Sequence, residues 1–261
     1  MSERELEGRV AVVVGAGSSG QALSNGEAAA LAYAEAGAVV ACVDRITEQA
    51  ERVAEEIRAG GGTALALTAD VTREADVTAA VARVVAELGV PHVLHNNVGV
   101  SIVGEVTDLD LDAWNRGLAL NLTSAYLTCR HVIPHMKAAG RGAIVNVSSL
   151  AAIRHTGYVY PVYSAAKAAV NQLTVSLALT YARDGLRVNA IMPGMIDTPM
   201  VSLQVTADPA ALAARHEASP TGRMGHPRDI ANAAVFLASD RAAYINGVCL
   251  PVDGGLSARC A

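Results

Sequence analysis

The sequence predicts an α/β fold, in which one doubly wound domain has helices flanking a seven-stranded parallel sheet. Short runs rich in Val, Ile and Ala alternate with longer amphipathic stretches along the whole chain, which is typical of repeated βαβ units. The short runs are apolar almost throughout, as expected for strands covered by helices on both faces. No linker-like change of composition interrupts the alternation, so we expect residues 1–261 to form a single domain.

This pattern places each element in order. The predicted strands are Arg9–Val14, Ala38–Val43, Thr63–Thr68, His92–His95, Ala143–Val147, Arg187–Ile191 and Val248–Pro251. The predicted helices are Gly26–Ala36, Thr47–Ala59, Thr72–Leu88, Leu111–Ala138, Val162–Arg183 and Pro227–Ser239. Two start signals support them, because Asn25 suits an N-cap position and Pro227 suits a first helical turn.

One long stretch, residues 193–225, departs from the alternation. It contains several prolines and glycines and only one short helical pattern, near Ala210–Glu217. Long excursions inside compact domains are usually functional, so we expect a substrate loop or lid here.

Composition narrows the class of protein. Of 261 residues, 52% are hydrophobic and 17% are charged, which excludes a disordered chain. The net charge of -5 and the lack of a Lys/Arg cluster argue against nucleic acid or an anionic membrane as the main partner and favour a small molecule. No apolar run approaches membrane-spanning length. The charged amino terminus has no secretory pattern, and four widely spaced cysteines suit a reducing compartment, so we expect a cytoplasmic protein.

A glycine-rich turn follows the first predicted strand and leads into the first predicted helix. It runs from Gly15 to Gly26 and includes Gly17, Ser18 and Asn25. Such a turn lets backbone N–H groups approach a pyrophosphate, with the positive end of the helix dipole behind them. The strand–turn–helix context therefore predicts a Rossmann-type dinucleotide site.

Asp44 ends the second predicted strand, where a carboxylate can accept hydrogen bonds from both adenosine ribose hydroxyls and repel a 2′-phosphate. Arg45 follows and could favour NADP, but a single exposed arginine beside an aspartate is poor compensation for a phosphate. We therefore expect NAD. The alternative is that Asp44 is only a turn residue at a strand end.

Tyr163 and Lys167 have the i, i+4 spacing that puts two side chains on one face of a helix. The chain has only two lysines, Lys137 and Lys167, so the spacing is unlikely to be incidental. A cation beside a phenol favours the phenolate and lowers a pKa that is ordinarily near 10. The pair therefore predicts a tyrosine that works as an acid and base near neutral pH, with a functionless surface pair as the alternative.

Further motifs occur in a fixed order along the chain. Asp70-Val71 follows the third strand, Asn96-Asn97-Val98-Gly99 follows the fourth, Asn121 begins an Asn-Leu-Thr-Ser run, and Ser149 stands fourteen residues before Tyr163. Pro193 to Thr198, Gly222 to Ile230 and Asp253-Gly254-Gly255 complete the set. With these motifs the chain resembles the classical short-chain dehydrogenases/reductases over essentially its whole length.

The resemblance implies a role for each matched residue. Tyr163 would exchange the proton with the substrate oxygen, Lys167 would lower the pKa of the phenol and bind the nicotinamide ribose, Ser149 would donate to the substrate oxygen, and Asn121 would hold a water beside Lys167. The coenzyme contacts would be Gly15, Ser18, Asn25, Gly26, Asp44, Asp70, Val71, Asn97, Gly99, Tyr163, Lys167, Pro193, Ile196 and Thr198. The substrate contacts would be Ser149, Tyr158, Tyr160 and Met195, with Ile102, Val103, Val159 and Met200 adding apolar surface.

Two features depart from the family pattern. Val14 stands where a threonine usually ties the glycine turn to the Asn-Asn-Ala-Gly segment, and the turn is about five residues longer, with Gly20 to Ser24 as the extra part. These changes leave open which backbone groups hold the pyrophosphate. Neither affects the predicted catalytic set.

The resulting hypothesis is an NAD(H)-dependent oxidoreductase that interconverts a cyclic or otherwise hydrophobic secondary alcohol and its ketone, with Tyr163 as general acid/base. Two alternatives stay open: an NADPH-dependent 3-oxoacyl thioester reductase, and a dinucleotide-binding sensor without turnover. No metal is expected: His131 and His135 have i, i+4 spacing, but Pro134 lies between them near a helix end. The helix residues 165–181 are apolar or small on nearly all faces, and the resemblance implies that a homotetramer covers them.

Overall fold

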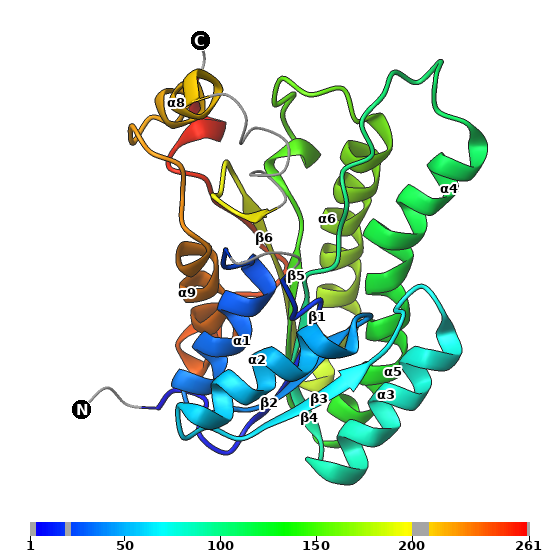
Figure 1. The fold of residues 1–261 in the computed structure, drawn as a ribbon. Helices are drawn as coiled ribbons and strands as arrows, with labels where there is room; N and C mark the ends of the chain where they lie inside the picture. Colours follow the sequence, from blue (N-terminus) through cyan, green and yellow to red (C-terminus); the bar gives the residue numbers. More distant parts are fainter. Residues whose placement is uncertain (1–3, 19–21, 200–208, 260–261) are drawn as a thin grey trace.

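The structure is a computed structural model that describes residues 4–18, 22–199 and 209–259. It contains a seven-stranded parallel sheet with helices on both faces, which confirms the predicted fold class (Figure 1). The strands are β1 Val10–Val14, β2 Val39–Asp44, β3 Ala64–Thr68, β4 Pro91–Asn96, β5 Gly142–Val147, β6 Leu186–Pro193 and β7 Cys249–Val252. Each overlaps one of the predicted strands. The inner strands are largely buried, which leaves an unbroken apolar run in the sequence, whereas the edge strands β3 and β7 are only partly buried.

The helices form two layers. They are α1 Asn25–Glu35, α2 Thr47–Ala59, α3 Glu74–Glu87, α4 Leu111–Leu118, α5 Ser124–Ala138, α6 Pro161–Tyr181, α8 Pro209–Ala218 and α9 Pro227–Ala238. One core cluster joins the sheet to α1, α2 and α9, and a second joins the opposite face to α3, α5 and α6. Short 3₁₀ turns occur at Leu150–Ala152, Ala182–Asp184, Asp240–Ala242 and Leu256–Ala258.

The strand order creates the position for a ligand. The sheet runs β3-β2-β1-β4-β5-β6-β7, so the chain leaves β1 in one direction and returns to its other side with β4. Ligands of open α/β sheets bind beyond the carboxyl ends of the strands at such a reversal. The segments that follow β1, β4 and β5 are therefore the ones placed to build a site.

Two predictions about helices are wrong in detail. The predicted helix Leu111–Ala138 is interrupted by a π-helical segment, Ala119–Thr123, between α4 and α5. The N-cap of α1 is Ser24 rather than Asn25, because the Ser24 hydroxyl accepts a hydrogen bond from the Glu27 backbone N–H at 3.1 Å. Pro227 does begin α9, as predicted.

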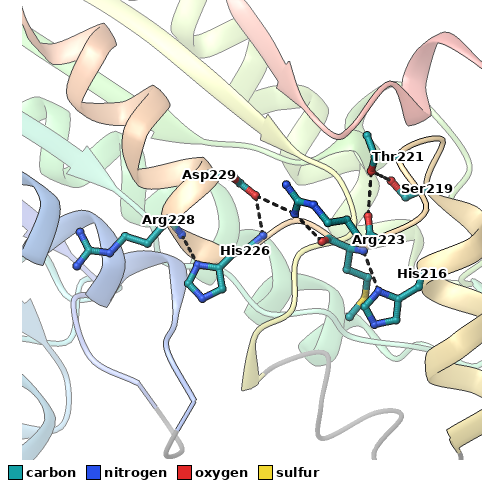
Figure 2. Close-up of polar contacts among 8 residues, drawn as sticks. His216, Ser219, Thr221, Arg223, His226, Arg228 and Asp229 are labelled. Atoms are coloured by element: carbon teal, nitrogen blue, oxygen red, sulfur yellow. Dashed lines mark hydrogen bonds and ion pairs between the residues drawn. The ribbon is translucent and has the colours of Figure 1, made fainter.

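The end of the excursion is fastened to the start of α9 (Figure 2). The Met224 backbone N–H donates to His216 Nδ1 at 3.1 Å, which ties the last turn of α8 to the connecting segment. Asp229 accepts from the His226 backbone N–H at 2.8 Å and from Arg223 at 3.4 Å. The orientation of α8 toward the body of the protein is thus set by hydrogen bonds on its carboxyl side.

None of the helices in the described part of the chain combines the length and apolar character needed to cross a bilayer.

Candidate active site

A cavity of about 620 Å³ opens beyond the carboxyl ends of the strands. Its size is within the range of pockets that hold small ligands. It runs from the glycine turn and Asp44 to Tyr158, Tyr160 and Arg215. The residues predicted for catalysis and for coenzyme contact line it except Gly26 and Asn121, which lie just behind the wall.

The glycine turn is built by close backbone packing. Gly15 has φ +76°, and a β-carbon built at Gly26 would lie 1.9 Å from the Gly15 carbonyl oxygen, so only glycine fits there. Ser24 also donates to the Gly17 carbonyl at 2.9 Å. Gly26 therefore brings α1 against the turn rather than lining the cavity. Gly20, in the extra part of the turn, lies outside the described residues.

Asn97 connects the glycine turn to the segment after β4 by a hydrogen bond, a connection that the family usually makes through a threonine at position 14. Its Nδ2 donates to the Gly15 carbonyl at 3.0 Å, and its backbone N–H donates to the Val14 carbonyl at 3.0 Å. The segment after β4 is thus joined to the turn after β1 although Val14 has no hydroxyl.

Two carboxylates face the adenosine end of the cavity. Asp44 accepts from the backbone N–H of Gly17 at 2.9 Å and of Ile46 at 3.1 Å, which fixes the carboxylate beside the glycine turn. Hydrogen bonds from the hydroxyl and backbone N–H of Thr72 lower the pKa of Asp70. Arg45 also lines this end and is exposed.

Tyr163 and Ser149 meet in the middle of the cavity. Burial raises the pKa of Tyr163, and a hydrogen bond with the Ser149 side chain opposes the rise. Ser149 also accepts from the Ala151 backbone N–H at 3.1 Å, which holds its hydroxyl at the end of β5. The tyrosine comes from the first turn of α6 and the serine from the strand end, so two elements position the pair.

Lys167 is almost completely buried one turn further along α6, at 3% exposure. Its Nζ donates to the Val147 carbonyl at 2.8 Å, and burial lowers its pKa to about 8. The ammonium lies 5.7 Å from the centroid of the Tyr163 ring. The expectation that Lys167 brings the pKa of Tyr163 below its ordinary value is not met, since desolvation of the phenol outweighs the other influences on it.

Asn121 lies in the π-helical segment. Its Oδ1 accepts from the Val100 backbone N–H at 3.1 Å, and its Nδ2 donates to the carbonyls of Val100 and Gly117, both at 2.9 Å. A β-carbon at Gly99 would approach Asn121 Oδ1 at 2.9 Å and Lys167 Nζ at 3.0 Å, so both side chains flank Gly99. π-Helical turns often occur at functional sites, and this one places Asn121 beside Lys167.

The segment after β6 closes the nicotinamide end. Pro193, Ile196 and Thr198 line the cavity as predicted. Gly225 fixes this segment, because its N–H donates to the Met195 carbonyl at 2.8 Å and its carbonyl accepts from Asp197 at 2.9 Å.

At the substrate end, Tyr158, Tyr160 and Met195 line the cavity as predicted. The rings of Tyr158 and Tyr160 stack with centroids 5.8 Å apart, and Tyr160 meets Tyr163 edge to face at 5.2 Å. Three further apolar residues predicted to face substrate do not line the cavity: Ile102 lies toward Gly117, while Val103 and Val159 are exposed. Met200 lies outside the described residues.

Arg215 is a cavity residue that the sequence did not reveal. It comes from α8 in the excursion, donates a hydrogen bond to the Tyr158 hydroxyl and is only 8% exposed. The sequence carries no signal for it, because the path of a long excursion is not determined by periodicity.

The residues present fit a nicotinamide dinucleotide. The first turn of α1 points its backbone N–H groups toward the glycine turn, where a pyrophosphate would bind. A side chain at position 26 would keep α1 from packing against the Gly15 carbonyl. Asp44 lies at the strand end where a ribose would bind, and Lys167 and Tyr163 lie at the other end of the same cavity. Within the described ranges no group of His, Cys, Asp and Glu could hold a metal ion, and His131 bonds Glu74 at 3.1 Å instead.

Comparison with known proteins gives consistent results. A family model described as enoyl-(acyl carrier protein) reductase matches residues 20–257. Cis-4-hydroxycyclohexanecarboxylate dehydrogenase of Sinomonas cyclohexanicum is 44% identical over 252 residues, which cover 96% of this chain and 97% of that protein.

Solved structures agree over the whole chain. A Burkholderia xenovorans protein assigned to the short-chain dehydrogenases/reductases is similar with a TM-score of 0.93 and 43% identity, covering 98% of this chain and 99% of that one. A gluconate 5-dehydrogenase from Burkholderia cenocepacia J2315, in complex with NADP and tartrate, is similar with a TM-score of 0.91 and 31% identity, covering 98% of both chains.

Proposed function

The chain belongs to the short-chain dehydrogenase/reductase family, and on that premise we propose that it is an NAD(H)-dependent enzyme that interconverts a cyclic secondary alcohol and its ketone. The observation that carries the proposal is the contact between Ser149 and Tyr163, beside the buried Lys167, in a cavity that reaches to Asp44. A cavity that served only to bind a dinucleotide would not need the Tyr163 phenol hydrogen-bonded to the Ser149 hydroxyl beside the buried Lys167 ammonium.

In the proposed reaction the alcohol carbon loses a hydride and the alcohol oxygen loses a proton. A bound nicotinamide coenzyme supplies the hydride acceptor, or the hydride donor in the reverse direction. Tyr163 takes the proton from the alcohol during oxidation and returns it to the carbonyl oxygen during reduction. Ser149, held by Ala151, donates to the same oxygen and stabilises the developing alkoxide.

Lys167 supports the proton transfer through its charge. With a pKa of about 8 it is mostly protonated at neutral pH, and its ammonium near the Tyr163 ring favours the phenolate over the neutral phenol. The hydrogen bond with Ser149 works against the desolvation that raises the pKa of the tyrosine. Asn121, which also flanks Gly99, is placed to hold a water beside the lysine.

The preference for NAD over NADP rests on Asp44. Its carboxylate is fixed beside the glycine turn by two backbone N–H groups, and a 2′-phosphate bound there would meet a like charge. The gluconate 5-dehydrogenase named above binds NADP, so the choice of coenzyme differs among similar proteins. In this chain Asp44 would decide it.

The substrate class rests on the walls of the cavity. Tyr158, Tyr160 and Met195 offer flat and flexible apolar surface around the site of proton transfer, which suits a saturated ring. The relative from Sinomonas cyclohexanicum is named for a ring alcohol, which supports the same class for this chain.

Three broader statements complete the proposal. The coenzyme site and the substrate site lie in one domain, residues 1–261, with residues 193–225 as the substrate loop. The enzyme works in the cytoplasm, since Cys42, Cys129 and Cys249 are free thiols. It assembles as a homotetramer through the side of the molecule that carries α6.

A coenzyme comparison tests the proposal. Purified protein is assayed with a panel of cyclic secondary alcohols and ketones, following the absorbance of the reduced nicotinamide with NAD and NADP in parallel. We expect turnover with a preference for NAD that narrows in Asp44→Ala, because the variant loses both the ribose acceptor and the repulsion of the phosphate. Asp240→Ala, at an exposed carboxylate away from the cavity, is the matched control.

Two results would count against it. A higher kcat/KM with NADPH in the wild-type protein would assign Asp44 the wrong role. Tight NADH binding without turnover of any alcohol or ketone would favour the sensor.

A further inference from the structure

Arg215 is a buried cation that is not paired with any carboxylate of the described residues. Its side chain reaches the cavity wall from α8, and its residue exposure is 8%. Its contacts among the described residues are the hydrogen bond to the Tyr158 hydroxyl and the ring face of Tyr158, whose centroid lies 5.2 Å from the guanidinium carbon. The ion pairs found in the described part of the chain do not include it.

The other charges on the cavity wall do not compensate Arg215. Asp44 and Asp70 are the carboxylates that line the cavity in the described structure, and both lie at the adenosine end. Lys167 is turned toward the Val147 carbonyl. An arginine does not release its proton in proteins, so this charge persists when buried. A buried charge without an opposite charge is costly, and one phenol satisfies only part of a guanidinium with five N–H donors.

The position of Arg215 relative to Tyr163 follows from the aromatic contacts. Tyr160 meets Tyr163 edge to face, Tyr158 stacks on Tyr160 with an angle of 12° between the rings, and Arg215 lies over Tyr158. Two tyrosine rings therefore separate the guanidinium from the proton-transfer residue. A group bound by Arg215 would therefore lie away from the carbon that reacts.

The segment that carries Arg215 is held in place independently of the cavity. The next residue, His216, accepts from the Met224 backbone N–H, and the following turn is closed by the contact of Ser219 with Thr221 at 2.9 Å (Figure 2). These bonds fasten the carboxyl end of α8. The guanidinium is thus not needed to anchor the helix, and its remaining donors can serve a ligand.

We propose that Arg215 is an anion-binding residue of the substrate site, so that the preferred substrate is a ring alcohol bearing a carboxylate remote from its hydroxyl. The planar guanidinium can bind a carboxylate with two parallel N–H donors, while Tyr158 fixes its orientation. The inference rests on the proposed function, since it names the substrate class of that same site. It makes Arg215 and Tyr158 the residues that distinguish charged from neutral ring alcohols.

The test compares two substrates that differ mainly in charge: 4-hydroxycyclohexanecarboxylate and 4-hydroxycyclohexanecarboxamide. For the wild-type enzyme with NAD we expect a kcat/KM at least about tenfold higher for the carboxylate. Arg215→Met should lower kcat/KM for the carboxylate by roughly 30- to 4,000-fold, the range for removing one partner of a buried charge pair. It should change the carboxamide by less than about threefold. Arg215→Lys should keep part of the preference for the carboxylate, because lysine keeps the positive charge but lacks the two parallel N–H donors of the guanidinium.

Two variants separate recognition of the anion from support of the fold. Arg223→Met removes the same charge from the same excursion, at an exposed position paired with Asp229, and should leave the preference unchanged. His216→Ala removes the hydrogen bond between the end of α8 and the Met224 backbone N–H, and it should change kcat/KM for both substrates alike. If Arg215→Met also lowers both rates alike, the arginine is structural and the inference is overturned.

A binding measurement keeps the inference distinct from the proposed function. Calorimetry of cyclohexanecarboxylate and cyclohexanecarboxamide with the wild-type protein and NADH should show tighter binding of the carboxylate, and Arg215→Met should abolish the difference. Equal binding of the two in the wild-type protein would overturn the inference even if alcohols are oxidised. Discrimination in binding without any turnover would count against the proposed function alone.

Discussion

Lys167 sets the energetics of the site at the scale of single residues. Its ammonium is buried, its pKa is lowered to about 8, and a backbone carbonyl is its hydrogen-bond acceptor. Burying a charge with so little compensation costs stability. In the proposed function this cost is the consequence of placing the charge beside Tyr163. Functional sites commonly hold groups whose pKa values are shifted in this way.

The cost should appear as a pH dependence of stability. Below pH 8 the lysine is protonated in both the folded and the unfolded state, so the folded state bears the full penalty. Between pH 8 and about 10.5 the folded state releases the proton first, and the free energy of unfolding of the wild-type protein should rise relative to Lys167→Met by about 3 kcal/mol. Chemical denaturation at several pH values measures it.

Lys137→Met is the matched control for this prediction. Lys137 is the other lysine in the chain, and it is partly exposed and paired with Asp184. A difference between wild type and Lys167→Met that stays flat, or falls as the pH rises, would mean that the ammonium is not held in an unfavourable environment.

The spacing of Tyr163 and Lys167 was enough to predict that they share a site, because one helix carries both. The direction of the pKa shift of Tyr163 was not predictable. It depends on desolvation by segments that are distant in sequence, and on how far the lysine is drawn toward the Val147 carbonyl. Spacing along one helix carries no information about either.

At the scale of elements, the join between β1 and α1 positions the coenzyme end of the cavity. Gly15 and Gly26 allow the turn and the helix to touch, and Asn97 fastens the segment after β4 to the same carbonyl. The turn, the helix start and the segment after β4 are therefore one packed unit. A change in one of them should displace the others.

Gly26→Ala tests this unit. Its β-carbon would lie 1.9 Å from the Gly15 carbonyl oxygen, so the turn or the helix must shift. We expect a loss of about 1–3 kcal/mol in the free energy of unfolding, the usual cost of overpacking, together with weaker NADH binding by fluorescence titration. Gly60→Ala is the control, because its β-carbon would meet neighbours no closer than 3.4 Å. Unchanged NADH affinity in Gly26→Ala would contradict the account of the turn.

The elements differ in how far the sequence predicts them. The inner strands were predicted because their burial leaves apolar runs that helices on a surface do not show; the edge strands β3 and β7 are only partly buried but keep short apolar runs. The interruption at Ala119–Thr123 was not, since a π-helical turn barely changes the apolar periodicity of a helix. The Asn-Leu-Thr-Ser motif identified Asn121 as a site residue but gave no hint of the local geometry that places it beside Gly99.

At the scale of the whole molecule, the helical layer on one side of the sheet has uncovered apolar surface. Leu179 near the end of α6 is 76% exposed, Ala165 and Ala168 on the same helix are exposed, and Tyr126 on α5 is 45% exposed. The helices α4, α5 and α6 lie together on this side (Figure 1). Exposed apolar surface along adjacent helices is typical of an interaction face.

We expect this face to be buried between subunits of a homotetramer. Light scattering at micromolar concentration should give the mass of four chains, and Leu179→Arg should shift the distribution toward smaller species, because it places a charge on the face. Val90→Arg, at a partly exposed position in the turn between α3 and β4, is the control. A wild-type protein that is monomeric under these conditions would refute the assembly.

The excursion marks the limit of prediction at this scale. Its proline and glycine content indicated a loop near the substrate, and the structure places Met195 in the cavity as predicted. Arg215 was missed because its contact with Tyr158 joins positions 57 residues apart, and neither residue has a sequence pattern that refers to the other. Long-range contacts of loops follow from the whole fold.

In the proposed function Tyr163 moves the proton in an alcohol–ketone interconversion. The most direct measurement is kcat with a cyclic secondary alcohol, together with the NADH dissociation constant, for wild type and Tyr163→Phe. The variant keeps the ring contact with Tyr160 and loses the hydroxyl. We expect kcat to fall by roughly 10²- to 10⁴-fold, the range for lost general acid/base catalysis, with NADH binding retained. Turnover in Tyr163→Phe close to that of the wild type would contradict the account.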